Sequence, residues 1–199
     1  MSDIQEKLKI EKKIRKGRVG DWFKNILTPS LESNNNSCIN FEIGCGHGHW
    51  LTSYAQENPS QNFVGIDLIT KRIVKATSKV SKRRLTNVSF CKADAIEFLE
   101  FCDIELSNTF IMYPDPWPKK RHFKRRLIQL PFLDLLAQKT QLGGKLFFMT
   151  DHVDYFDWSC AMISDSMHWN FMEEEWPHQE RSYFQNILPT NQFFCALRS

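Results

Sequence analysis

One carboxylate, Asp115, stands in a proline-rich segment whose residue types could position it for chemistry. The segment Tyr113-Pro114-Asp115-Pro116-Trp117-Pro118 follows the apolar run Phe110-Ile111-Met112, which is typical of a buried strand. Each proline fixes its own φ, and a residue before proline is driven to extended geometry, so we expect Asp115 to be held stiffly. Asp115 would then lie at the carboxyl end of a strand, where ligands of open α/β sheets bind.

A dense cluster of positive charge follows this acid directly. Six Lys/Arg side chains occur within the eight residues from Lys119 to Arg126, with His122 among them. A rigid acid beside such a cluster indicates chemistry on a polyanion. Considered alone, the segment fits equally well a stiff loop followed by a solvated basic helix, which the pattern predicts over 123–137.

A glycine-rich turn and a second acid, both earlier in the chain, favour the first interpretation. The apolar run 38–43 leads into Gly44-Cys45-Gly46-His47-Gly48, and a helical pattern follows. Glycines at a strand-to-helix turn allow a ligand to approach the backbone N–H groups at the helix start. The run 61–67 ends in Asp67, about twenty residues beyond the glycines, where a carboxylate can bind the hydroxyls of a ribose.

The remaining patterns predict an α/β fold. A basic helix over 70–84 precedes a short strand at 88–91, and Asp94 either caps the next helix or accepts a hydrogen bond from an adenine amino group. Further strands are expected at 108–113 and 145–150, the latter after a turn at Gly143-Gly144. Five strand–helix alternations are typical of a mostly parallel, Rossmann-like sheet covered on both faces. The tail, 152–199, should add a helix and strands at 169–174 and 193–198.

The N-terminal region differs in composition from the rest. We expect a basic arm and linker over 1–36, with a short helix and a linker at 29–37, and a catalytic domain over 37–199. The arm could contact RNA, although a surface tail is the commoner role for a terminal segment.

Composition sets limits on the environment of the protein. The 199 residues have a formal net charge of +3, so the local cluster says more about partners than the total charge does. The six cysteines form no CxxC pair and no metal-ligand spacing, which favours a reducing, cytoplasmic setting without a bound metal. No apolar run reaches the length of a membrane span, and no signal-peptide pattern is present.

These motifs together resemble the tRNA (guanine-N7-)-methyltransferases, a family of class I S-adenosylmethionine-dependent methyltransferases. The resemblance covers roughly residues 15–199, and its most specific piece is the Pro-Asp-Pro-Trp segment with its basic continuation. Other matching pieces are Arg15-x-Gly17-Arg18, Phe41 to Gly48, Phe63 to Asp67, Lys124 to Leu127, Gln141 to Gly144, and Thr150-Asp151.

The resemblance implies a role for each matching residue. The expected function is RNA-binding tRNA modification: transfer of a methyl group from S-adenosylmethionine to N7 of a tRNA guanine, guanine 46 of the variable loop, by a monomer or homodimer. Asp115 would be catalytic. The implied cofactor-binding residues are Glu42, Gly44, Gly46, Asp67, Asp94 and Asp115. The implied substrate-binding residues are Lys119, Asp151, Ser182 and Gln185. The implied RNA-binding residues are Arg121, His122, Lys124, Arg125 and Arg126.

The sequence departs from the family pattern near its end. Ser182-Tyr183-Phe184-Gln185 replaces a Thr-x-Phe-Glu that reads the guanine, and an amide accepts fewer hydrogen bonds from the guanine edge than a carboxylate does. Base specificity or rate is therefore the property that this change would affect.

Two alternatives have different sequence requirements. One is a methyltransferase acting on rRNA or a small molecule; the other is a catalytically weak RNA-binding module with the same fold. The module need not retain all four cofactor carboxylates, whereas this chain carries an acid at each position. The order Asp-Pro-Trp also differs from the Asn/Asp-Pro-Pro-aromatic loop used on exocyclic amines, which favours a ring nitrogen as the target.

Overall fold

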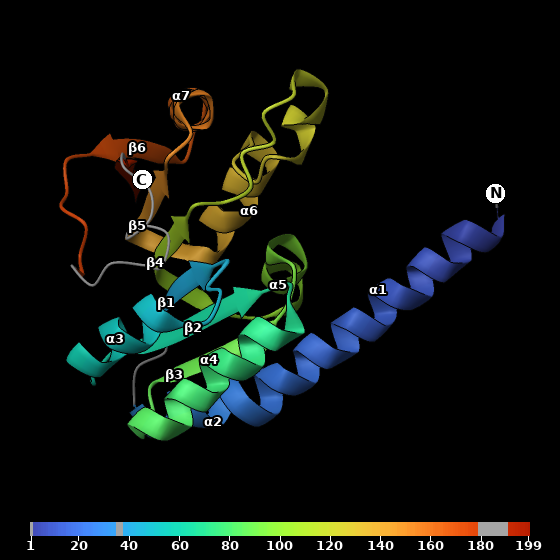
Figure 1. Cartoon of the computed structure of the whole chain (residues 1–199), viewed down its shortest axis with the longest axis vertical. Helices are drawn as coiled ribbons and strands as arrows, with labels where there is room; N and C mark the ends of the chain where they lie inside the picture. Colours follow the sequence, from blue (N-terminus) through green and yellow to red (C-terminus); the bar gives the residue numbers. More distant parts are fainter. Residues whose placement is uncertain (1, 35–37, 179–190) are drawn as a thin grey trace.

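The computed structural model of the chain describes residues 2–34, 38–178 and 191–199 (Figure 1). Its centre is a seven-stranded sheet in the order β3-β2-β1-β4-β5-β7-β6. The strands are β1 (Cys38–Ile43), β2 (Asn62–Asp67), β3 (Val88–Lys92), β4 (Glu105–Met112), β5 (Thr140–Thr150), β6 (Trp169–Met172) and β7 (Gln192–Arg198). The first five pair in parallel, whereas β7 is antiparallel to both β5 and β6. The predicted Rossmann-like sheet is therefore confirmed.

Helices cover both faces of this sheet. They are α1 (Ser2–Trp22), α2 (Thr28–Asn34), α3 (His49–Glu57), α4 (Thr70–Arg83), α5 (Ala95–Phe101), α6 (Leu130–Lys139) and α7 (Val153–Ser164), with a π-helical turn (Phe23–Leu27) and the 3-10 helix η2 (Lys120–Arg125). Alternate strand residues point to opposite faces, so Phe147 packs in the layer with α3 and α4 and Phe148 in the layer with α5, α6 and α7. None of the helices in the described residues combines the length and apolar character needed to cross a bilayer.

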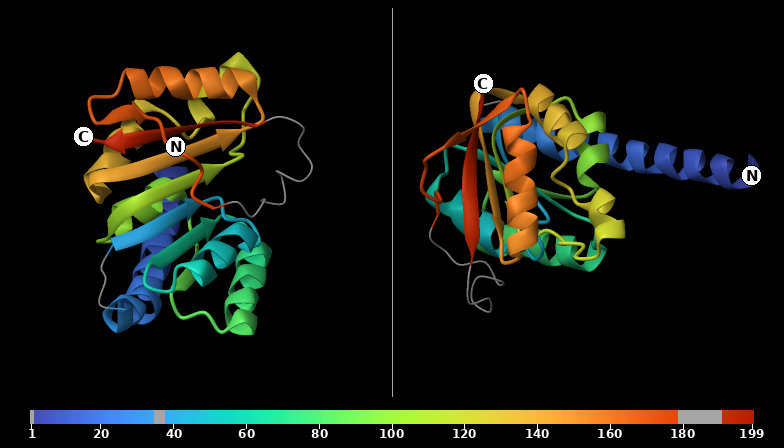
Figure 2. Two further views of the ribbon diagram at one scale, coloured as in Figure 1. Left: turned by 90° about the vertical axis from the view of Figure 1, so that its left-hand side faces the viewer. Right: turned by 90° about the horizontal axis from the view of Figure 1, so that it is seen from above.

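Helix α1 differs from the short helix that the sequence predicts. It runs from Ser2 to Trp22, and its N-terminal half extends well beyond the rest of the molecule (Figure 2). Its other end joins the core, because Val19 is buried and the Trp22 ring lies 5.8 Å from that of Phe98.

Three further elements correct the sequence predictions. The basic segment is not the start of a helix over 123–137: η2 ends at Arg125, and α6 begins at Leu130 with Pro131 in its first turn, where a proline is tolerated. The expected linker 29–37 contains α2, and Leu31 packs against the core. Strand β5 starts at Thr140, and Gly143-Gly144 lies inside it where the register with β4 shifts.

Candidate active site

The glycine turn after β1 opens the edge of the sheet to a ligand. Gly44 and Gly46 have φ values of 79° and 55°, a region that residues with a Cβ rarely adopt. The N–H groups of Gly44 and Cys45 both donate to the Ile66 carbonyl oxygen, at 2.9 Å, which ties the turn to β2. A Cβ at either glycine would meet nothing within 4 Å, so the space beside the turn is open.

Asp67, at the end of β2, holds the same turn from the other side. Its buried carboxylate accepts hydrogen bonds from the backbone N–H of Gly46 (3.1 Å) and of Ile69 (2.7 Å). Arg72, on α4, pairs with it at 3.3 Å. This contact could not be predicted from the sequence, because α4 carries basic residues on several sides. Asp67 therefore lies beside the glycine turn, as the ribose-binding prediction requires.

Glu42, on β1, is a buried carboxylate with an unsatisfied atom. It is 4% exposed, and its Oε2 has no hydrogen-bond partner among the described residues. Burial, and to a lesser extent the charge of Asp67, raises the pKa of Glu42 to about 8. A buried acceptor without a donor is costly, so a cationic ligand with N–H groups would be stabilised here. S-adenosylmethionine carries an ammonium and a sulfonium, and the site fits it in this respect.

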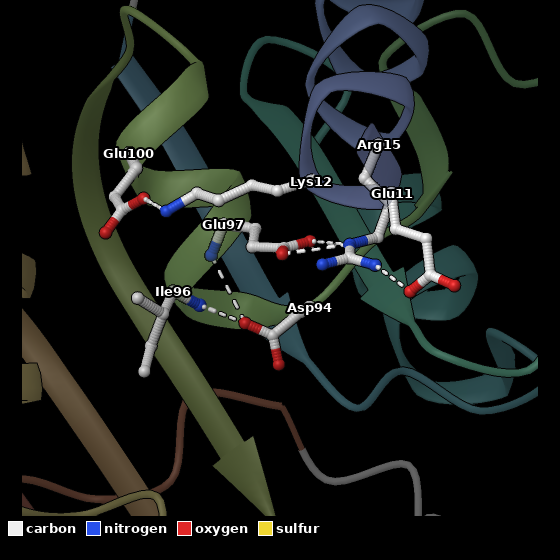
Figure 3. Close-up of polar contacts among 7 residues, drawn as sticks. All are labelled: Glu11, Lys12, Arg15, Asp94, Ile96, Glu97 and Glu100. Atoms are coloured by element: carbon white, nitrogen blue, oxygen red, sulfur yellow. Dashed lines mark hydrogen bonds and ion pairs between the residues drawn. The ribbon is translucent and has the colours of Figure 1, made fainter. Parts of the chain in front are cut away.

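Asp94 caps helix α5, which is one of the two roles that its sequence context allows. Its Oδ1 accepts hydrogen bonds from the backbone N–H groups of Ile96 (3.0 Å) and Glu97 (3.2 Å) at the start of α5 (Figure 3). Both bonds end on the same oxygen, which leaves Oδ2 to face outward. Its predicted contact with the cofactor stays a prediction.

The loop that carries Asp115 is held in an unusual backbone conformation. Tyr113 and Trp117, on either side of the acid, have φ values of 52° and 46°. Bulky residues adopt this region only when their surroundings enforce it, and such residues cluster at functional sites. The Tyr113 N–H donates to the Met149 carbonyl oxygen, and its hydroxyl lies 2.7 Å from the Asn191 Oδ1. Asp115 itself is exposed, so the loop presents its carboxylate outward.

Arg126 is buried, whereas the RNA-binding role implied by the resemblance would need an exposed side chain. It is 2% exposed; its Nε donates to the Pro116 carbonyl oxygen (2.9 Å) and its Nη1 to that of Asp154 (3.2 Å). The guanidinium carbon lies 3.8 Å from the centre of the Phe123 ring. Burial lowers the pKa of Arg126, which is the expected effect of removing a cation from water. The side chain therefore supports the Asp115 loop from inside.

The other cations of the segment remain at the surface. Lys119, Arg121, Lys124 and Arg125 are exposed and His122 is half-buried. Two of them also brace the loop, because Arg125 lies 4.8 Å from the centre of the Trp117 ring and the His122 ring packs edge-on against it at 5.7 Å. This bracing role was not predicted from the sequence, where its only signal was an aromatic residue close to several cations.

The predicted substrate residues are only partly placed. Asp151 is exposed immediately after β5, next to the strand that carries the Asp115 loop. Ser182 and Gln185 lie outside the described residues. Among the described residues, no group of three His, Cys, Asp or Glu side chains is arranged to bind a metal ion.

The glycine turn, Asp67 and the Asp115 loop lie together at one edge of the sheet. Strand β1 pairs in parallel with β2 on one side and β4 on the other, so the glycine turn, Asp67 and the Asp115 loop all lie at the carboxyl ends of neighbouring strands. The strand order reverses between β1 and β4, which is where open α/β sheets bind their ligands.

The fold and this site define a class I S-adenosylmethionine-dependent methyltransferase. A solved structure described as an rRNA methylase from Streptococcus thermophilus superposes with a TM-score of 0.56 over 81% of this chain and 87% of that chain, at 11% identity, which shows a shared fold. Residues 36–191 match the family model described as "Putative methyltransferase".

Sequence relatives give the particular family. The chain is 42% identical over 123 residues to the tRNA (guanine-N(7)-)-methyltransferase of Syntrophotalea carbinolica, covering 61% of this chain and 53% of that protein. It is 34% identical over 157 residues to the protein of the same name from Streptococcus mutans, covering 78% and 74%. The chain thus spans about half the length of the first relative and about three quarters of the second. It belongs to the tRNA (guanine-N7-)-methyltransferase family.

Proposed function

We propose that this protein transfers the methyl group of S-adenosylmethionine to N7 of a guanine in tRNA, guanine 46 of the variable loop. The observation that supports it most directly is that three features lie together where the strand order reverses. The glycine turn follows β1, Asp67 ends β2, and the braced Asp115 loop follows β4, which is adjacent to β1. Kinship with proteins named for this reaction supplies the substrate.

Different residues of the site would bind the cofactor and stabilise the charge that develops on the base. When bound, S-adenosylmethionine supplies a methyl group on a sulfonium, which guanine N7 attacks in line while the C–S bond breaks. The lone pair of N7 is free at neutral pH, so no general base is needed. Glu42 and Asp67 would bind the cofactor. Asp115 and Asp151 would lie near the base, which becomes cationic, and their negative charge would stabilise that developing charge.

Positioning is the main requirement of such a reaction. Holding two reactants in line can supply several kcal/mol of the reduction in barrier, up to roughly 7–11 kcal/mol in model systems. The Asp115 loop is suited to this because Tyr113, Trp117 and Arg126 fix its backbone. The exposed cations Arg121, Lys124 and Arg125 would contact tRNA phosphates, and Lys119 would contact the target nucleotide.

The setting follows from the proposed substrate. We propose a cytoplasmic enzyme that acts as a monomer or homodimer. All six cysteines lie within the described residues, where none of them forms a disulfide and four are buried, which is compatible with a reducing compartment.

The decisive experiment maps the methylated nucleotide. The purified protein is incubated with unmodified tRNA and labelled cofactor, and N7-methylguanosine is located by borohydride and aniline cleavage. We expect one cleavage, at guanine 46, that Asp115→Asn suppresses. Label at another position or on another atom would refute the proposed specificity. Label in rRNA or a small molecule alone would assign the enzyme to a different substrate class, and binding without label would indicate a non-catalytic RNA-binding module.

A further inference from the structure

Helix α1 is fixed on α5 by two ion pairs between the helices (Figure 3). The Arg15 Nε donates to both carboxylate oxygens of Glu97, at 2.9 Å and 2.8 Å, and the Lys12 ammonium lies 3.0 Å from a Glu100 oxygen. Beyond these contacts no other element of the described residues covers the N-terminal part of the helix, since every residue from 4 to 14 is exposed. The arm is therefore a helix held at one end and presented to solvent along the rest.

One face of α1 is a line of lysines. Lys9 lies three residues before Lys12 and four before Lys13, and Lys16 lies four and three residues after them, which places all four on the same side of a helix. Together with Glu100 and Phe101 of α5 they line a shallow groove of about 460 Å³. Four lysines and one glutamate give this groove a formal charge of 4 − 1 = +3, and the glutamate is already paired with Lys12.

The groove has the character of a polyanion site. The ammonium groups of Lys12 and Lys16 lie 5.7 Å and 5.8 Å from the centre of the Phe101 ring, so the lysines lie against apolar surface while their charge stays accessible. Lys9 and Lys16 are seven residues apart, about 10 Å along a helix axis, so the lysines form an extended basic surface and not a single point of charge.

The position and composition of α1 favour RNA over a lipid surface as this polyanion. Figures 1 and 2 show the N-terminal half of α1 and the basic segment around η2 projecting from the same side of the sheet. The exposed aliphatic side chains of α1, such as Ile4 and Ile14, do not form the continuous apolar face of a membrane-surface helix, because Lys7 and Glu11 lie between them around the helix.

We propose that the lysine face of α1 is a second RNA-binding surface, which contacts tRNA phosphates away from the methylated guanine. This rests on the proposed function for the identity of the RNA. The ion pair between Arg15 and Glu97 sets the angle of the arm, so that its lysines and the cations of η2 engage one tRNA together.

The first test removes positive charge from the lysine face of α1 and compares the effect on tRNA binding with that of removing the same charge from another helix. The variant K9Q/K13Q/K16Q keeps both ion pairs with α5; the control K71Q/K75Q/K82Q removes three exposed lysines from α4. Dissociation constants for tRNA are measured from 50 to 200 mM salt. In the arm variant we expect binding weaker by about tenfold or more and a slope of log K against log salt shallower by about 2–3, with unchanged cofactor affinity.

Several outcomes would overturn the proposal. An equal loss in both variants would mean that total charge, not this face, determines tRNA affinity. An unchanged salt slope in the arm variant would mean that the lysines contact no phosphate. Binding of the wild type to phosphatidylserine vesicles that the arm variant loses, with unaltered tRNA affinity, would assign the face to a lipid surface. If the protein methylates no tRNA but the arm variant still binds tRNA more weakly than the wild type, the proposed function is refuted and the RNA-binding role of α1 stands.

The second test concerns the angle of the arm. Glu97→Arg raises the net charge by two, so general electrostatics predicts tighter tRNA binding, whereas loss of the ion pair to Arg15 predicts weaker binding. We expect weaker binding, and recovery to near the wild-type value in R15E/E97R, which restores both the pair and the net charge. Tighter binding in E97R, or no recovery in the double variant, would show that the pair does not position the arm. Thermal unfolding verifies that each variant is folded.

Discussion

Replacing Arg126 by methionine separates a structural from an RNA-binding role for this arginine. The change keeps most of the side-chain volume but removes the hydrogen bonds to the carbonyl oxygens of Pro116 and Asp154. Hydrogen bonds from a charged donor are worth about 1.5–3 kcal/mol each, and methionine avoids the cost of burying a charge, which offsets part of the loss. We therefore expect the free energy of unfolding to fall by about 2–4 kcal/mol. At about 2–4 °C per kcal/mol for a domain of this size, the Tm should fall by about 5–15 °C.

The same substitution should also affect turnover. Pro116 is the neighbour of Asp115, so releasing its carbonyl oxygen frees the loop that carries the carboxylate we propose as catalytic. A displacement of about 1 Å can lower a rate by about 100-fold, and we expect kcat to fall by that order while the affinity for tRNA changes little. Steady-state kinetics, filter binding and thermal unfolding measure the three quantities.

Arg125→Met provides the matched control, because it removes the same charge from the preceding residue, which is exposed. It should leave the Tm within about 2 °C, since an exposed cation–π contact is worth about 0.5–1 kcal/mol, and it should weaken tRNA binding. The opposite pattern would refute the reasoning: a normal Tm and kcat for Arg126→Met, with weaker and less salt-dependent tRNA binding, would mean that Arg126 reaches the RNA.

Three further substitutions test other parts of the site. Asp115→Asn should lower kcat strongly at an unchanged Tm, because this exposed carboxylate contributes charge and not packing; full activity would exclude the electrostatic role. Burial and a neighbouring carboxylate raise the pKa of Glu42 from 4.5 to about 8, so the folded state keeps a proton that the unfolded state loses, and stability falls by roughly 1.4 kcal/mol per pH unit as pH rises across that window. Glu42→Gln should flatten this fall in denaturant titrations at about pH 5.5 and 7.5, and an equal slope would contradict the assignment. Gly48→Ala brings a Cβ within 2.6 Å of the Phe90 ring and should cost about 1–3 kcal/mol more in urea unfolding than Gly46→Ala, whose Cβ meets nothing within 4 Å; equal losses would show that only backbone strain matters.

The sequence predicted the framework well because each parallel strand is marked by local chemistry. The run Cys38–Ile43 is a strand with the predicted bounds, and the glycines after it and Asp67 at the end of the next strand lie at the same edge of the sheet. Apolar runs that end in glycine or an acid carry this information in a few adjacent residues, so it needs no knowledge of distant contacts.

Features that depend on distant contacts could not be predicted in this way. A run of six cations gives no sign that Arg126 alone turns inward, because its partner Asp154 lies 28 residues away. The left-handed backbone of Tyr113 and Trp117 has no sequence signal either, since residues of this size are not associated with positive φ. The register shift that places Gly143-Gly144 within β5 likewise depends on pairing with β4.

The place of β7 in the sheet has a consequence for the synthesis of the protein. β7 is the last strand along the chain among the described residues, yet it lies between β5 and β6 and pairs with both. Until residues 192–198 leave the ribosome, β5 has an unpaired edge and β6 has no neighbour, and open edges of this kind promote association between chains. A nascent chain can thus form the parallel strands and the glycine turn early, but its sheet stays open to wrong partners until translation has passed β7.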